Sequence, residues 1–182
     1  ISNFFSFTAL IRIFNGINHL HSHHCIHRDL KPSNILINHD FEVCINDFGT
    51  IKELNNSANA NTAFDFGSAI YSSPEQMGGR NVSYPTDIFS FGSIIYFLFE
   101  RKDMFKRDYN MSYISHIRKN EIPQMTNVSK DVQELCNKCV KYNPNERPSM
   151  DDIKNILYKI IRSLYFFDQY FIVDKMKSIH KE

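Results

Sequence analysis

Two short stretches decide the fold of this chain: HRDLKPSN at residues 27–34 and DFG at residues 47–49. Their aspartates, Asp29 and Asp47, lie 18 positions apart. Between them, residues 35–45 contain two short β-prone runs, ILI and FEVCI, separated by a turn-prone Asn-His-Asp. This pattern is typical of a hairpin. The sequence therefore predicts a small β-hairpin between two acidic loops.

Helical periodicity surrounds this hairpin on both sides. From residue 7 to residue 20, apolar residues recur at three- and four-residue steps, which indicates an amphipathic helix with one buried face. The polar residues 55–61 (NNSANAN) have no periodicity and are expected to form an exposed loop. Four further helix-like stretches, separated by Pro, Asn or Ser, cover residues 87–99, 113–118, 132–140 and 150–164. The predicted fold class is mainly α, with a small β-hairpin around the two loops.

Length and composition indicate one intracellular domain. The chain has 182 residues, 42% of them hydrophobic, which is enough for one cored unit. Its net charge of +1 offers no general attraction to nucleic acid or to anionic membranes. The four cysteines are too few for a disulfide framework and are expected to be reduced thiols of a cytoplasmic protein.

No stretch of the sequence is long enough to cross a membrane. The longest nearly apolar run, residues 88–99, is well short of the roughly twenty residues that a spanning helix needs. The opening residues ISNFF lack the basic flank and the cleavage site of a secretory signal. Because the first residue is Ile1, we expect the chain to begin inside a longer protein.

Taken together, the two acidic loops resemble the catalytic loop and the metal-binding loop of eukaryotic protein kinases. The resemblance extends from about Phe7 to about Ile161. It implies that residues 1–163 are a partial kinase domain, the C-terminal lobe, and that residues 164–182 are a C-terminal extension. Three further motifs follow in the order of that family: GSAIYSSPE at 67–75, PTDIFSFG at 85–92 and NPNERPS at 143–149.

The resemblance implies that Asp29, Lys31 and Asn34 are catalytic. Asp29 would accept the proton of the substrate hydroxyl, and Lys31 would place its ammonium near the γ-phosphate of ATP. Asn34 and Asp47 would supply oxygen ligands to Mg²⁺, a hard cation that prefers such ligands. Leu36 would form part of the apolar floor beneath the adenine. The implied cofactors are therefore ATP and Mg²⁺.

Other motif residues are implied to be structural or regulatory. Asp87 would accept hydrogen bonds from the backbone of the first loop, which makes its buried charge tolerable. Arg147 would pair with Glu75. Ser68 stands where the family usually has Thr, and its hydroxyl would bond Asp29 and Lys31. The other members of this set are His27, Arg28, Phe48, Gly49 and Thr62.

Arg28 suggests regulation, because kinases of this type often use this arginine to hold a phosphate on the activation segment. Thr62 is the candidate phosphosite, with Ser57 second. The alternative is that an Asn-rich loop simply contains such hydroxyls.

The KPSN wording around Lys31 resembles Ser/Thr and tyrosine-kinase-like enzymes, so the resemblance implies transfer to Ser or Thr hydroxyls of a protein substrate. Only 26 residues precede His27, and they contain neither a glycine-rich phosphate loop nor a strand lysine. We therefore expect an N-lobe to be present in the full-length protein. The isolated chain is expected to have little kinase activity and to expose the apolar surface that would meet that lobe.

Two other hypotheses remain open. A non-catalytic C-lobe or pseudokinase scaffold would bind protein partners; the missing N-lobe favours it, and the intact catalytic residues count against it. A zinc-binding protein would use a cluster at the end of the first helix, namely His19, His21, His23, His24, Cys25 and His27. Their close spacing, however, spreads these side chains around the helix end. Cys136 and Cys139 have metal or redox spacing, but a single pair in an apolar helical run is more typical of buried core thiols.

Overall fold

The computed structural model describes residues 3–38, 42–54, 66–79, 82–106, 112–126 and 128–165. Its α-helices are α1 (Asn3–Ser22), α2 (Pro74–Met77), α3 (Tyr84–Glu100), α4 (Ser112–Arg118), α5 (Lys130–Cys139) and α6 (Met150–Tyr165). Its strands are β1 (Cys25–Ile26), β2 (Ile35–Ile37), β3 (Val43–Ile45) and β4 (Lys52–Glu53). Short 3-10 helices are η1 (Pro32–Asn34), η2 (Phe48–Thr50), η3 (Phe66–Tyr71) and η4 (Pro144–Glu146). The predicted class, mainly α with a small hairpin, is confirmed.

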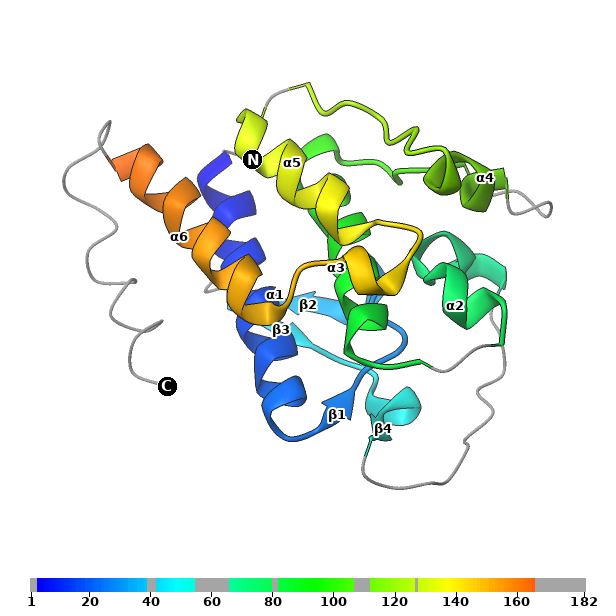
Figure 1. Cartoon of the computed structure of the whole chain (residues 1–182). Coiled ribbons are helices and arrows are strands. Elements are labelled where there is room, and N and C mark those ends of the chain that lie inside the picture. The colour runs from blue at the N-terminus through cyan, green and yellow to red at the C-terminus, as the bar shows by residue number, and fades with distance from the viewer. Residues whose placement is uncertain are drawn as a thin grey trace.

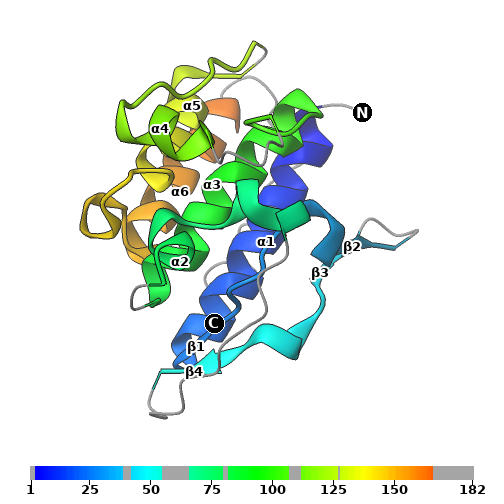
Figure 2. The same ribbon diagram turned by 90° about the vertical axis from the view of Figure 1, so that its right-hand side faces the viewer.

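Helix α3 forms the centre of the molecule (Figure 1), and it packs against α1 and α5. Helix α6 packs in turn against α5. The two small sheets lie along one side of α1, whereas α4, α5 and α6 lie on the other side (Figure 2). The core is therefore helical, and the strands carry the loops at its edge. No described helix has the length and hydropathy to span a membrane.

Local sequence explains where α3 begins and why it lies so close to α5. At its start, the backbone N–H of Ser83 donates to Thr86 Oγ1 at 3.3 Å, and a proline occupies the first turn, where its missing N–H has no intrahelical partner. In the middle of the helix, a Cβ added at Gly92 would lie only 2.7 Å from Cys139 Cβ and from Val140 Cγ1. The helix crossing therefore depends on glycine at this position.

The paired cysteines of α5 lie in that same crossing. Both Cys136 and Cys139 are fully buried, and the Cys136 thiol donates to the carbonyl oxygen of Gly92 at 3.4 Å. Burial raises the pKa of Cys136 to about 12 and raises that of Cys139 as well. The prediction that this pair consists of core thiols is confirmed.

Two antiparallel ladders hold the acidic loops in place. The predicted hairpin is β2–β3, with Ile35 opposite Ile45 and Ile37 opposite Val43. A second ladder, between β1 and β4, joins the residues before the first loop to those after the second. The first and second loops are thus bracketed by backbone pairing, which brings them to the same edge of the helical core.

Two serines of α3, one turn apart, differ in how their buried hydroxyls are satisfied. Ser90 Oγ donates to the carbonyl of Tyr71 at 2.8 Å, whereas Ser93 Oγ has no hydrogen-bond partner among the described residues. We expect Ser90→Ala to lower the free energy of unfolding by about 0.5–1.5 kcal/mol, because it removes a buried hydrogen bond. Ser93→Ala should leave it unchanged or raise it slightly. Urea denaturation measures both, and equal losses for the two variants would contradict this account.

Candidate active site

The first loop folds around Asp29. Lys31 Nζ lies 2.8 Å from Asp29 Oδ2, and Asn34 Nδ2 donates both to Asp29 Oδ2 at 3.0 Å and to the Asp29 carbonyl at 2.8 Å. Pro32 starts the short helix η1 that turns Asn34 back toward the aspartate. The side chains of Asp29 and Lys31 remain partly accessible, with 23% and 17% of their surface exposed. A solvent-borne substrate can therefore reach them.

The second loop meets the first through backbone hydrogen bonds. The N–H of Asn46 donates to the carbonyl of Asn34 at 2.8 Å. Asn46 thus contacts the first loop directly, and Asp47 is the residue that follows it. Asp47 has a left-handed backbone, with φ 67° and ψ 69°, a conformation that aspartate tolerates better than most residues. The imidazole of His27 adds a second tie through Nε2, 3.1 Å from the carbonyl oxygen of Asn46.

These contacts define a donor set that fits a hard divalent cation. The amide nitrogen of Asn34 is used within the loop, so its amide oxygen is the group that could coordinate a metal. Asp47 contributes a carboxylate on the exposed side of η2. Amide and carboxylate oxygens are ligands that Mg²⁺ prefers. The predicted metal residues Asn34 and Asp47 are thus brought close together in the fold.

A buried carboxylate supports the first loop from behind. Asp87 is fully buried and accepts from His27 N at 2.8 Å and from Arg28 N at 2.9 Å. His21 Nε2 lies 2.9 Å from the same carboxylate. Three donors make this burial tolerable. They also hold Arg28 in a left-handed conformation, with φ 70°, which is uncommon for a residue other than glycine.

The Arg28 side chain connects the two loops. Its Nε donates to the carbonyl of Thr50 at 2.5 Å, and Thr50 Oγ1 donates to the carbonyl of His27 at 2.7 Å. Burial lowers the pKa of Arg28, although the charge of Asp87 acts to raise it. Gln76, in α2, donates to the Arg28 carbonyl at 2.7 Å. Arg28 therefore ties together the first loop, the second loop and α2.

Three residues of the predicted set lie on the accessible side of the hairpin and η2. Leu36 is 49% exposed and Phe48 is 55% exposed. Gly49 is close to the metal-ligand candidate, because a Cβ added there would lie 3.5 Å from Asp47 Oδ1. Apolar surface therefore borders the acidic loops and is available to a ligand or to another part of the protein.

Glu75 and Arg147 form a buried, two-pronged ion pair. Arg147 Nη1 lies 2.6 Å from Glu75 Oε1, and Nη2 lies 2.8 Å from Oε2. Thr86 Oγ1 also donates to Glu75 at 3.1 Å. Burial alone would raise the pKa of Glu75, but the hydrogen bonds and charge of Arg147 outweigh it and lower that pKa. The pair fastens α2 to the segment before α6.

The structure describes the predicted regulatory residues only in part. Thr62 and Ser57 lie outside the described residues, and for Ser68 only the backbone is described, as part of η3. Further along the chain, Tyr71 is anchored, because its Oη donates to Asp103 Oδ1 at 2.5 Å. Asp103 was not among the residues singled out from the sequence, so this anchor was missed.

The contact of His21 with Asp87 was also not predicted, although the sequence indicates that His21 is buried. It follows Ile17 by four positions and therefore continues the buried face of α1. The neighbouring histidines have separate partners: His23 Nδ1 lies 2.8 Å from the His19 carbonyl, and His24 Nδ1 lies 3.1 Å from Tyr84 Oη.

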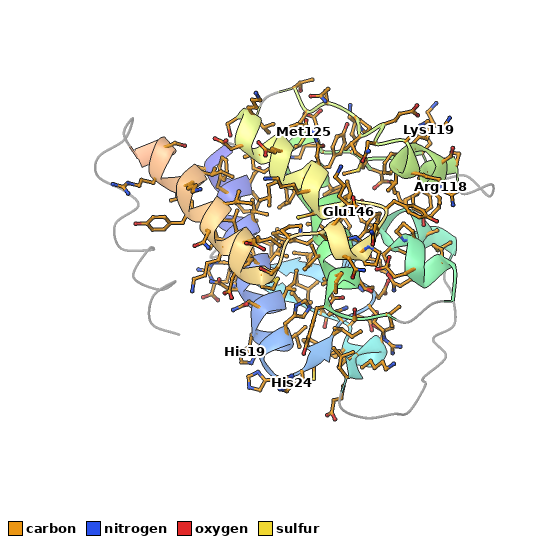
Figure 3. The ribbon with its side chains drawn as sticks, in the orientation of Figure 1. His19, His24, Arg118, Lys119, Met125 and Glu146 are labelled. Carbon is orange, nitrogen blue, oxygen red and sulfur yellow. The ribbon has the colours of Figure 1, made fainter. Side chains whose placement is uncertain are left out.

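The zinc hypothesis receives no support from this arrangement. His19 and His24 project from the edge of the molecule at the end of α1 (Figure 3), whereas His21 is turned inward to Asp87. Within the described ranges, no group of three His, Cys, Asp or Glu side chains is arranged to hold a metal.

Comparisons with known proteins agree on one family. A family model for the protein kinase domain matches residues 6–159. The chain is 34% identical over 152 residues to mitogen-activated protein kinase kinase 1c of Physcomitrium patens, covering 78% of this chain and 44% of that protein. It is 32% identical over 146 residues to serine/threonine-protein kinase PLK1 of Xenopus laevis, covering 80% of this chain and 24% of that protein. The chain therefore spans less than half the length of these curated relatives.

Proposed function

The chain belongs to the protein kinase domain family, and from this premise we propose that the protein containing it transfers the γ-phosphate of ATP to Ser or Thr hydroxyls of protein substrates. One observation carries the proposal: Asp29, Lys31 and Asn34 form one bonded group, and the Asn46–Asn34 backbone bond brings Asp47 alongside it. Related proteins named as serine/threonine-protein kinases support the choice of hydroxyl.

In the proposed reaction, the residues of the first loop position the substrate and neutralise charge. Lys31 and Asn34 both bond to Oδ2 of Asp29, so we assign Oδ1 to accept the proton of the attacking hydroxyl. The Lys31 ammonium lies where it can also approach the transferred phosphoryl group. Asn34 Oδ1 and the Asp47 carboxylate would hold Mg²⁺, which neutralises charge on the phosphate oxygens when it is bound.

The nucleotide-binding site would be completed by another part of the protein. Leu36, Ile37 and Phe48 are each about half exposed beside the acidic loops, and we propose that they face the adenine or an N-lobe supplied by the longer protein. In this proposal residues 1–163 are the C-lobe, and residues 164–182 are an extension. A cytoplasmic location is part of the proposal, supported by four unpaired thiols.

A phosphate switch is a further part of the proposal, with Thr62 as the modified residue and Arg28 as its receiver. The Arg28 guanidinium is bonded to the Thr50 carbonyl, so the phosphate would have to share or replace that contact. Mass spectrometry of the active full-length protein should find phosphate on Thr62. Active protein with no phosphate on Thr62 or Ser57 would remove this idea.

The kinase proposal is tested by assaying the full-length protein with γ-labelled ATP, Mg²⁺ and a generic protein substrate. We expect label on phosphoserine or phosphothreonine and complete loss of transfer when EDTA removes the metal. Label on phosphotyrosine alone would overturn the Ser/Thr assignment. A pure, folded protein with no transfer under any metal condition would favour the non-catalytic scaffold instead.

A further inference from the structure

Gln76, in the short helix α2, forms hydrogen bonds in two directions. Its side-chain nitrogen Nε2 donates to the carbonyl oxygen of Arg28 at 2.7 Å. Its side-chain oxygen Oε1 accepts from the backbone N–H of Ser73 at 3.1 Å, and the Ser73 hydroxyl lies 3.3 Å from the same oxygen. One amide group therefore connects the start of α2 to the first loop.

The two backbone partners of this amide determine its orientation. The Arg28 carbonyl can only accept a hydrogen bond, and the N–H of Ser73 can only donate one. If the amide were turned over, two acceptors would meet at one end and two donors at the other. Nε2 therefore faces Arg28, and Oε1 faces Ser73.

Capping of α2 explains only the Ser73 side of this arrangement. The Ser73 hydroxyl accepts from the backbone N–H of Gln76 at 3.4 Å, and the two residues form a capping box. Glu serves in such a box as well as Gln does, and its charge is favourable in the first turn of a helix. What Gln adds is a donor, and that donor is used outside α2, on the first loop.

The bond to the first loop ends on the peptide group that directly precedes the proposed catalytic base. The carbonyl oxygen of Arg28 and the N–H of Asp29 belong to one planar unit, and that N–H donates to His27 Nδ1 at 3.3 Å. Both polar atoms of the unit are thus hydrogen-bonded, the oxygen by Gln76. The Gln76 bond therefore restricts rotation of the peptide plane from which Asp29 projects.

The other end of this connection is firmly held. Ser73 is fully buried, and Glu75 is fixed by its two-pronged ion pair with Arg147. We propose that Gln76 is a positioning residue: it sets the peptide plane before Asp29 relative to the motif at 67–75. This inference rests on the proposed kinase function for its catalytic consequence, but not for its geometry.

Two substitutions separate positioning from capping, because each keeps one half of the amide. Gln76→Glu keeps an acceptor for Ser73 but places a second acceptor against the Arg28 carbonyl. Gln76→Lys keeps a donor for that carbonyl, on a side chain one bond longer, and gives up the acceptor. The same two changes at Gln124, which is exposed, are the matched controls for charge.

In the full-length protein at about pH 8, where glutamate is ionised, we expect Gln76→Glu to lower kcat by about 10- to 100-fold, because small misplacement of a catalytic group is enough for such a loss. Gln76→Lys should keep kcat within a few-fold of the unmodified protein. The KM for ATP should change less than about threefold in both, since Gln76 is not among the proposed nucleotide contacts. The Gln124 variants should not change kcat. A capping role alone predicts the reverse order, so a kcat for Gln76→Lys equal to or below that of Gln76→Glu would overturn the proposal.

A second readout does not require activity, and it keeps this inference separate from the kinase assignment. Amide hydrogen exchange at Asp29 should be slow in the unmodified protein and in Gln76→Lys, and faster in Gln76→Glu. Carbon NMR should show the Arg28 carbonyl resonance shifted in Gln76→Glu and little changed in Gln76→Lys. If the unmodified protein transfers no phosphate, the kinase proposal fails, while exchange still decides this one. If Gln76→Lys does not fold, Gln76→Glu decides; exchange at Asp29 equal to that of the unmodified protein would refute positioning.

Discussion

Replacing Asp29 with alanine should lower phosphate transfer by the full-length protein by about 10²- to 10⁴-fold, the range for loss of a general base. The substitution removes the proposed proton acceptor. It also removes the carboxylate that holds Lys31 Nζ at 2.8 Å and Asn34 Nδ2 at 3.0 Å, so the other two residues of the loop lose their alignment. The initial rate of transfer from labelled ATP measures the effect.

Two further variants make this result specific. Asp29→Asn keeps an oxygen for the Asn34 bond but is a poor base, so it should lose nearly as much kcat with a smaller structural change. Asp151→Ala removes an exposed aspartate at the start of α6 and should leave the rate unaltered. Turnover unchanged in both Asp29 variants would mean that another group is the base, or that a contaminating kinase produced the signal.

The sequence predicted most of the regular structure because its signals are local. Apolar residues at three- and four-residue steps mark α1, and the two β-prone runs around a turn mark β2 and β3. The pairing of β1 with β4 was not predicted, since each strand has two residues, too few for any alternation. Yet that ladder, with the Asn46–Asn34 bond, is what brings the two acidic loops together.

Long-range partners of charged groups were predictable only where the family resemblance supplied them. Composition alone gives no reason to bury Asp87 inside the most apolar helix, or to pair Glu75 with a residue 72 positions away. The Tyr71–Asp103 bond and the His21–Asp87 bond had no such guide. The first joins η3 to the residues after α3, and the second joins α1 to α3. Both therefore depend on how α3 packs against its neighbours, and a single sequence does not encode that packing as a readable pattern.

The second large effect is expected for the ion pair of Glu75 and Arg147. Arg147→Met should lower the free energy of unfolding by about 3–5 kcal/mol, because the buried Glu75 carboxylate then has no cationic partner. Arg147 also donates from Nη1 to the Pro85 carbonyl and from Nε to the Lys141 carbonyl, so neighbouring carbonyls lose donors as well. Urea denaturation of the protein measures the loss.

A double substitution and a surface pair provide the comparison. Glu75→Leu combined with Arg147→Met removes both charges, so it should be less destabilising than the sum of the two single variants. Breaking the exposed pair of Glu134 and Lys138, whose atoms lie 2.9 Å apart, should change stability far less, because solvent screens it. Additive losses at the buried pair would show that the charges do not interact as the geometry indicates.

The pH dependence of stability tests the same pair without relying on a large substitution. The pKa of Glu75 is lowered below its ordinary value of 4.5 in the folded state, so the folded protein binds that proton less readily than the unfolded chain. The stabilisation is therefore complete above about pH 4.5 and is lost as pH falls through the lower, folded-state pKa. Glu75→Gln should be less stable than the unmodified protein at pH 7, and the difference should shrink on acidification below pH 4.5. A difference that stayed constant down to the acid unfolding limit would mean that the Glu75 charge contributes nothing to the fold.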